Sequence, residues 1–349
     1  MWDMVFSRIT ETVLAAVNPA QRFFWPFLVA NLIMLVAVCF WRLPKDSGRL
    51  AEKTLENAFP KDVYQHRSAL LDYRYAAINA LFSVLIQCVA GLGTVVITRL
   101  TTVACGAIFG VLAPFNEVGF GVCLAYTFLM IVLFDTANFF AHYLQHRVPA
   151  LWEFHKVHHS AEVLTPITVL RMHPVDDLIT ASTHMLTFGL ANGLFLYQFG
   201  GTAMTLTVWG TNIFFFTYFA FGYHLRHSHV WVMFPKGVRE VFSSPALHLV
   251  HHSKASQHWD KNFAPVFTLW DRLFGTLYQP AQHETIEFGI ADEDARELTS
   301  VPQLYLTPFR KALGVVASPG LQSRFRKWRD GLGMTLQRAR SKQPATDAG

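Results

Sequence analysis

Residues 119–159 read GFGVCLAYTFLMIVLFDTANFFAHYLQHRVPALWEFHKVHH, an apolar run followed closely by five histidines. A helix that enters a membrane near Gly119 rises about 1.5 Å per residue and clears about 30 Å of hydrocarbon near Asn138. His142 and His146 would then emerge just beyond the lipid. This stretch therefore predicts a transmembrane helix that carries histidines to the membrane surface.

Three histidine-rich motifs have a spacing typical of metal ligands. They read His142-Tyr-Leu-Gln-His146, His155-Lys-Val-His158-His159 and His248-Leu-Val-His251-His252. Positions i, i+3 and i+4 lie on one face of a helix, so each motif directs its imidazoles in a common direction. Adjacent histidines diverge by about 100° on a helix, so one motif can serve two neighbouring ions.

The number of nitrogens predicts two metal ions. Imidazole suits zinc, copper, iron and nickel, and eight imidazoles exceed what one tetrahedral zinc ion needs. The alternative is that these are surface or core histidines that cluster by chance. Chance clustering can explain any single histidine, but it does not readily explain three motifs that all have the spacing of metal ligands.

The composition indicates an integral membrane protein. The chain of 349 residues is 52% hydrophobic and 15% charged, whereas a soluble domain is about a quarter charged. The run that begins at Phe23 has no small-residue cleavage site after it and is typical of a retained anchor. We expect an all-α helical bundle with a histidine-rich helical cap and about five spans, each long enough to cross about 30 Å of hydrocarbon, at 23–41, 76–98, 119–140, 177–198 and 202–222.

One further apolar segment, 102–115, is short, and we expect it to be interfacial or re-entrant, with a sixth span as the alternative. The four cysteines lie in apolar segments without a CxxC pair, so they predict neither a disulfide framework nor a thiolate metal site. The expected organisation is an anchor and loop at 1–75, a membrane domain with the cap at 76–302, and a basic tail at 303–349.

The turn at 199–202 predicts that the last two spans form a hairpin. The chain then leaves and re-enters on one side, which brings residues 142–176 and 223–302 to the same membrane face. The basic tail indicates that this face is cytoplasmic, in the inner or cytoplasmic membrane. The positive charge of the tail suits anionic lipid headgroups better than nucleic acid, although an ordinary solvated tail fits equally well.

Asp135 lies seven residues before His142 and so on nearly the same helix face. It could accept a proton from the second ring nitrogen of a metal ligand and so fix the orientation of that ring. Alternatively, it marks the membrane interface.

Further motifs follow one another in order along the chain: Leu151-Trp152-Glu153-Phe154, Arg171-Met172-His173-Pro174, His227-Ser228-His229-Val230, Ser244-Pro245, Asp260-Lys261-Asn262-Phe263 and Trp270-Asp271-Arg272-Leu273-Phe274-Gly275-Thr276. With the three histidine motifs, they make residues 135–280 resemble the fatty acid hydroxylase and sterol desaturase superfamily. The resemblance implies a membrane-bound non-haem di-iron oxygenase that uses two irons and dioxygen to hydroxylate or desaturate a lipid. Zinc can replace the iron during purification.

The resemblance also implies a set of metal ligands: His142, His146, His155, His158, His159, His227, His248, His251 and His252. Additional ligands or supporting residues are expected among His173, His224, His229 and His258. Tyr143 departs from the family pattern, which often has Arg after the first histidine, so no subfamily is assigned. His66, His184 and His283 match nothing in the pattern.

Electrons must reach such a centre from outside. The sequence has no GxGxxG motif opening a βαβ unit and no evident haem domain, so a separate reductase with a ferredoxin or a cytochrome b5-like carrier is expected. The sequence leaves open hydroxylation or desaturation, the lipid and the position of attack. Two other functions are alternatives. A membrane metal transporter would need ionisable residues inside the spans, whereas these histidines lie beyond the hydrocarbon ends. A zinc hydrolase would need three protein ligands, an open position and a carboxylate base, which the excess of histidines does not fit.

Overall fold

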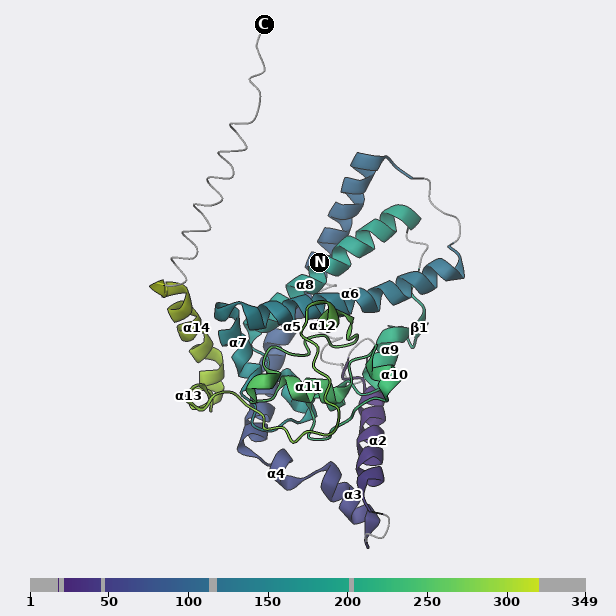
Figure 1. Cartoon of the computed structure of the whole chain (residues 1–349). Helices are drawn as coiled ribbons and strands as arrows, with labels where there is room; N and C mark the ends of the chain where they lie inside the picture. The colour runs from purple at the N-terminus through teal and green to yellow at the C-terminus, as the bar shows by residue number, and fades with distance from the viewer. Residues whose placement is uncertain (1–17, 19–21, 45–47, 113–117, 201–203, 320–349) are drawn as a thin grey trace.

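The computed structural model describes residues 18, 22–44, 48–112, 118–200 and 204–319. Helices dominate these residues, and one small antiparallel sheet joins β1 to β2 (Figure 1). The elements are α2 (Trp25–Arg42), α3 (Leu50–Ala58), α4 (Lys61–Tyr64), α5 (Arg67–Phe109), α6 (Phe120–Arg147), α7 (Pro149–His159), η1 (Pro166–Leu170), α8 (Pro174–Phe199), β1 (Thr207–Val208), β2 (Thr211–Asn212), α9 (Ile213–Ala220), η2 (His224–His227), α10 (Lys236–Arg239), α11 (Pro245–His251), η3 (Ser256–His258), α12 (Leu269–Leu273), α13 (Asp292–Ala295) and α14 (Val301–Ala317).

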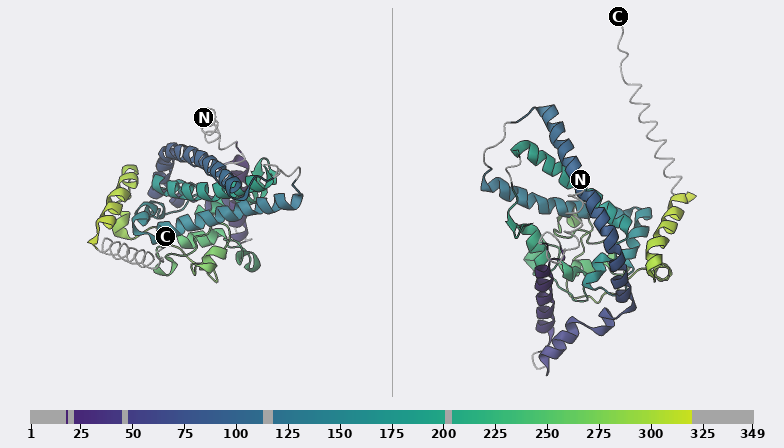
Figure 2. Two further views of the ribbon diagram at one scale, coloured as in Figure 1. Left: turned by 90° about the horizontal axis from the view of Figure 1, so that it is seen from above. Right: turned by 180° about the vertical axis from the view of Figure 1, so that it is seen from behind.

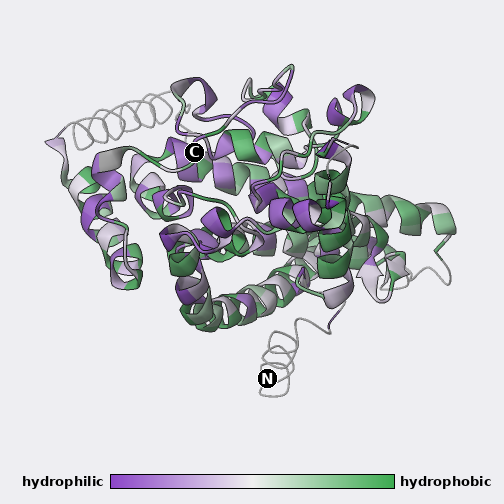
Figure 3. Cartoon of the chain, turned by 90° about the horizontal axis from the view of Figure 1, so that it is seen from below, coloured by the Kyte–Doolittle hydropathy of each residue, from purple (hydrophilic) through white to green (hydrophobic). Residues whose placement is uncertain are grey.

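Among the described residues, α2, α5 and α6 are the helices long and apolar enough to cross a membrane. The 43 residues of α5 correspond to a helix of about 65 Å. It carries exposed Leu81, Leu85, Val103 and Ile108 along its length. Figure 3 shows that hydrophobic residues make up most of the long helices. The chain is therefore a membrane protein.

The predicted separate piece at 102–115 is wrong where the structure describes it. Residues 102–109 continue α5 without a break, and the helix ends at Gly110, whose φ is 85°. Arg99, just before this segment, is exposed on the helix surface and leaves the backbone hydrogen bonds of α5 intact.

Small residues allow α5 and α8 to pack closely (Figure 2). A Cβ atom added at Gly189 would lie 2.7 Å from Cβ of Ile97, and one added at Gly193 would lie 2.5 Å from Cβ of Thr101. Thr102 Oγ1 also donates a hydrogen bond to Gly193 O at 3.0 Å. Such contacts are typical of helices that pack within a membrane.

The predicted span at 202–222 is wrong in its described part. Residues 207–212 form the β1–β2 hairpin, and α9 has only eight residues. Polar groups interrupt the apolar run, since Asn212 Nδ2 donates to Thr127 O on α6 and Leu206 N donates to Thr127 Oγ1. The turn of the hairpin uses positive φ angles at Trp209 and Gly210. The described part of 202–222 therefore does not form the second span of the predicted transmembrane hairpin.

Elements α7, η1 and α14 pack around the end of the bundle where α6 finishes and α8 begins. Arg171, after η1, joins these pieces: it donates to Asp72 Oδ1 at 2.7 Å, to Val157 O at 3.0 Å and to Ser160 Oγ at 2.7 Å. Leu304 of α14 is buried in the same cluster as Tyr75 and Val157. Residues 303–317 of the predicted tail thus belong to the packed helix α14, and residues 320–349 lie outside the described part.

Candidate metal centre

Nine histidines from four elements come together as two adjacent groups. The first histidine group contains His142, His146, His155, His159 and His251, and the second contains His158, His227, His248 and His252. Within each group, the potential ligand atoms all lie within 4.8 Å of one another. These are the nine residues that the sequence analysis named as ligands.

Adjacent histidines divide between the two groups, as the helical geometry predicts. His158 belongs to the second group and His159 to the first. His251 belongs to the first group and His252 to the second. Helices α7 and α11 therefore each supply both groups. This division places the two groups side by side.

The Nε2 atoms converge in each group. In the first group, Nε2 of His159 lies 3.2 Å from Nε2 of both His146 and His155. In the second, Nε2 of His248 lies 2.8 Å from that of His227 and 3.2 Å from that of His252. The Nε2 atoms of His142 and His251 are buried without a hydrogen-bond partner.

These separations fit nitrogen atoms that share a metal ion. Two nitrogens bound at about 2.1 Å to one ion are about 3.0–3.4 Å apart when the angle between them is near 90–109°. Where the proton of each ring is on Nδ1, the facing Nε2 atoms present lone pairs to one another, and a cation between them would bind both. The donor set of both groups therefore suits a metal ion.

In four of the five histidines of the first group, Nδ1 faces an acceptor. His142 Nδ1 lies 3.0 Å from Phe263 O, and His251 Nδ1 lies 2.7 Å from Lys261 O. His146 Nδ1 lies 3.4 Å from Asp260 Oδ1. A proton held on Nδ1 by such an acceptor leaves the Nε2 lone pair free to bind a metal.

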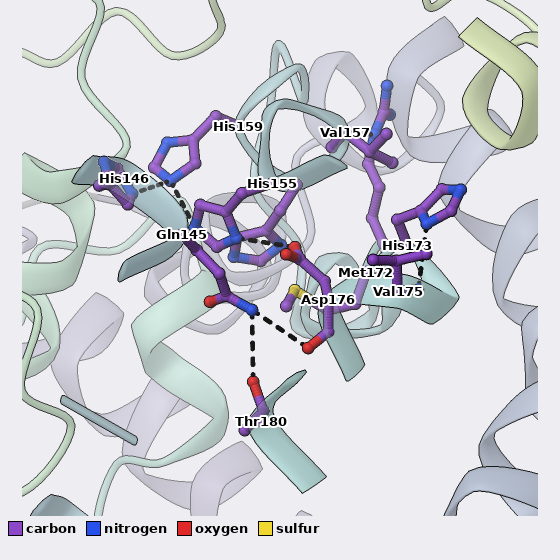
Figure 4. Close-up of polar contacts among 12 residues, drawn as sticks. Gln145, His146, His155, Val157, His159, Met172, His173, Val175, Asp176 and Thr180 are labelled. Atoms are coloured by element: carbon purple, nitrogen blue, oxygen red, sulfur yellow. Dashed lines mark hydrogen bonds and ion pairs between the residues drawn. The ribbon is translucent and has the colours of Figure 1, made fainter. Parts of the chain in front are cut away.

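His155 faces a fully buried carboxylate. Its Nδ1 lies 2.8 Å from Oδ2 of Asp176, and Gln145 Nε2 donates at 3.1 Å to the backbone oxygen of the same aspartate (Figure 4). Asp176 is not among the residues predicted for the site from the sequence. Its only signal is a place in the first turn after His173-Pro174, which it shares with Asp177.

Asp135 has a different role from the predicted contact with a ligand. Its two oxygens accept hydrogen bonds from Val266 N at 2.7 Å and Phe267 N at 3.1 Å. Asp271 similarly accepts from Phe263 N and Ala264 N. The two carboxylates fix the loop whose Phe263 carbonyl faces His142, so Asp135 acts on the ligand through the backbone.

Burial keeps the histidines in the form that binds metal. It lowers the pKa of His155 to about 3 and the pKa values of His158, His159 and the histidines of η2 and α11 well below their ordinary value. Neighbouring imidazoles lower several of these pKa values further. The rings are neutral near pH 7, as metal ligation requires.

The four additional candidates lie outside both groups. His173 caps α8 by accepting from Val175 N, and its Nε2 faces Tyr305 O. His224 Nε2 faces Arg22 O, and His229 Nε2 faces Asn57 O. His258 Nε2 lies 3.1 Å from Glu284 Oε2. Each ring therefore supports a loop or helix end.

Two cavities border the histidine groups. The helix-side cavity, of about 390 Å³, is lined by α5, α6, α8, α9 and η2 and reaches histidines of both groups, including His142, His155 and His248. The cap-side cavity, of about 490 Å³, reaches His146, His159 and His251 of the first group, beside Trp152 and Lys254. A molecule in the helix-side cavity can therefore meet both groups at once.

Comparisons with known proteins agree with this site. Residues 127–276 match the family model of the fatty acid hydroxylases. The ornithine lipid hydroxylase OlsE of Rhizobium tropici is 29% identical over 168 residues, which cover 48% of this chain and 46% of that protein. Alkylglycerol monooxygenase of Caenorhabditis elegans is 28% identical over 175 residues, covering 49% and 30%.

Cholesterol 25-hydroxylase of Rattus norvegicus is 32% identical over 156 residues, which cover 44% of this chain and 47% of that protein. The chain thus spans about half the length, or less, of these relatives. No solved structure matches the chain.

Proposed function

We propose that this chain, whose residues 127–276 belong to the fatty acid hydroxylase family, hydroxylates a C–H bond of a membrane lipid with dioxygen and electrons from a separate donor. The observation that carries the proposal is the pair of adjacent all-imidazole groups at the end of one cavity. The metal-dependent family and the lipid hydroxylases among its relatives support it.

Two iron ions are the proposed cofactors, one in each histidine group. Nine imidazoles exceed the four ligands of a tetrahedral zinc site, and nitrogen ligands suit iron. Bound iron supplies the dioxygen chemistry that attacks an unactivated C–H bond, which no amino-acid side chain can do. The protein contributes the ligands, their orientation and a cavity that positions the substrate.

The residues of the helix-side cavity perform the positioning. Phe134, Phe219 and Phe263 give it apolar walls, while histidines of both groups form one end. Gln145 and Asp176 fix the orientation of His155 at that end. Because α5, α6 and α8 all contribute to the cavity, a lipid whose tail remains among these helices could place its reacting carbon there.

The relatives favour hydroxylation over desaturation, since their names are hydroxylase and monooxygenase. The proposed donor is a reductase with a ferredoxin or a cytochrome b5-like carrier. The proposed location is the inner or cytoplasmic membrane, with the metal centre on the cytoplasmic face. Reporters fused after Lys156 and Lys254 should both read cytoplasmic, and a periplasmic signal from both would reverse the orientation.

Lipid mass spectrometry tests the activity. Purified protein loaded anaerobically with ferrous iron would receive a total lipid extract, a reductant and isotopically heavy dioxygen. We expect a lipid that gains one heavy oxygen atom, and no gain with His159→Ala. Loss of two hydrogens without oxygen gain would establish desaturation instead, and an unchanged lipid profile with a fully loaded enzyme would reject both activities.

A further inference from the structure

The helix-side cavity contains charged side chains that an alkyl chain or a sterol ring does not require. Arg22, Asp177 and Arg226 all line it, among apolar residues and the histidines of both groups. Two cations and one anion leave this part of the lining with an excess of positive charge. Sites for purely apolar ligands have few polar groups, each with a role in orientation.

Arg226 is buried beside the second histidine group, with 8% of the residue exposed. Its Nη1 donates to Tyr218 Oη at 2.8 Å and its Nη2 donates to His248 Nδ1 at 3.0 Å. Its Nε has no hydrogen-bond partner, and it interacts electrostatically with Asp135 and Asp271 without a hydrogen bond to either carboxylate. A buried guanidinium is costly when no anion accepts its N–H groups.

Metal binding would increase this demand for a partner. A neutral imidazole that binds a metal through Nε2 carries its proton on Nδ1. His248 Nδ1 then ceases to accept from Arg226. A second N–H of the guanidinium is left without its acceptor, in addition to Nε.

Arg22 reaches the same cavity from the segment before α2. Its Nη1 donates to Tyr223 Oη at 2.9 Å. The rings of Tyr218 and Tyr223 contact each other with centroids 5.3 Å apart, so the two arginine–tyrosine pairs are neighbours. The two tyrosines thus hold both guanidinium groups on one wall of the cavity, near the metal centre.

We propose that Arg22 and Arg226 bind an anionic group, a carboxylate or a phosphate, in the headgroup of the lipid substrate. The inference rests on the proposed function and deepens it. The carbon that reacts would lie within a few bonds of this anionic group. The far end of the acyl chain would stay outside the cavity. Asp177 then faces any amino or hydroxyl donor of the same headgroup. Guanidinium groups pair with carboxylates and phosphates in this way because their N–H donors match the spacing of the oxygens.

Binding measurements without turnover test the inference. Iron-loaded protein in detergent would be titrated under anaerobic conditions with two acidic lipids, N-palmitoylglycine as the carboxylate and palmitoyl lysophosphatidic acid as the phosphate. Hexadecylglycerol and cholesterol are the neutral lipids for comparison. We expect at least one acidic lipid to bind about tenfold or more tightly than the neutral lipids, as a charge-assisted hydrogen bond implies. The tighter of the two acids identifies the anion as carboxylate or phosphate.

Variants assign the preference to the two arginines. Arg22→Gln and Arg226→Gln should each remove most of the preference for the acidic lipid and leave the affinity for hexadecylglycerol unchanged. Arg67→Gln is the matched control, because Arg67 is exposed and pairs with Glu162 outside the cavity. If Arg226→Gln loses iron by elemental analysis, Arg22→Gln decides, since its side chain contacts Tyr223 and no histidine ligand.

Equal affinity for acidic and neutral lipids would overturn the inference, as would a preference that survives both substitutions. The proposed activity is tested separately. Headgroup-selective binding without oxygen gain would reject the hydroxylase and retain the anion site. Oxygen gain on a neutral lipid that binds equally to all variants would retain the hydroxylase and reject the anion site.

Discussion

Asp176 Oδ2 lies 2.8 Å from Nδ1 of His155, and both residues are almost completely buried. The contact joins the first turn of α8 to α7, so it links the orientation of a proposed ligand to a helix that lines the helix-side cavity. A carboxylate behind a histidine fixes the ring and raises its basicity toward a metal.

Asp176→Asn should therefore lower the affinity for iron by about 10–100-fold. The amide keeps the shape of the side chain but loses the charge that favours a proton on Nδ1. Competition with a chelator, followed by elemental analysis, measures the change. Asp260→Asn should have a smaller effect, because Asp260 lies 3.4 Å from His146 and is more exposed. Equal iron retention by wild type and Asp176→Asn would contradict the role assigned to Asp176.

The division into two groups predicts the metal content of histidine variants. The wild type should bind close to two ions per chain. His159→Ala removes a nitrogen from the first group and His248→Ala removes one from the second, so each should retain about one ion and lose activity, since neighbouring residues cannot replace the ligand. Elemental analysis after anaerobic reconstitution measures both.

His66→Ala and His283→Ala are controls outside the groups. His66 caps α5 through Ser68 N, and His283 packs against Trp231. Both variants should keep two ions. A wild type that never exceeds one ion would contradict the two-metal proposal.

Local helical geometry explains how much of the site the sequence could predict. Spacings of three and four residues place histidines on one helix face, and adjacent histidines must diverge, so His158 and His159 serve different groups. Asp176 and Arg226 were not predicted as parts of the site because their roles depend on tertiary contacts with His155 and His248. No residue spacing encodes those contacts.

The error at 202–222 has a comparable cause. Mean apolarity suggested a span, but Thr211 and Asn212 lie in a hairpin whose turn needs positive φ at Gly210. Asn212 gains a hydrogen bond to Thr127 O on α6, which hydropathy cannot show. The three histidine motifs still meet, because α6 packs on α7, η2 packs on α11, and histidine rings such as those of His159 and His251 join the two pairs.

The close packing of α5 and α8 predicts that Gly193→Val destabilises the protein. A Cβ atom there would lie 2.7 Å from Thr98 O and 2.5 Å from Thr101 Cβ, so the helices must separate, at a cost of about 1–3 kcal/mol. Thermal unfolding in detergent measures the loss. Gly106→Val, on the facing helix α5, is the control because nothing lies within 4 Å of its added Cβ. Equal unfolding temperatures would show that the two helices do not pack as described.

The buried histidines predict acid sensitivity of the metal-free protein. Burial lowers the pKa of His173 and of His224 to about 4, whereas an unfolded histidine has a pKa of about 6.5. Between these values the unfolded state binds protons that the folded state does not. The free energy of unfolding therefore falls as the pH drops from about 6.5 to about 4, by up to about 1.4 kcal/mol per pH unit for each such histidine.

His173→Asn isolates one of these contributions. Asparagine can accept from Val175 N as the cap of α8, but it does not titrate. The free energy of unfolding of this variant should fall less steeply between pH 6.5 and 4 than that of the wild type, by about 1.4 kcal/mol per pH unit. Denaturant titrations of the metal-free proteins at several pH values measure both slopes, and metal-free samples avoid the separate loss of ions in acid. Parallel curves for the two proteins would show that His173 takes up its proton equally well in the folded state.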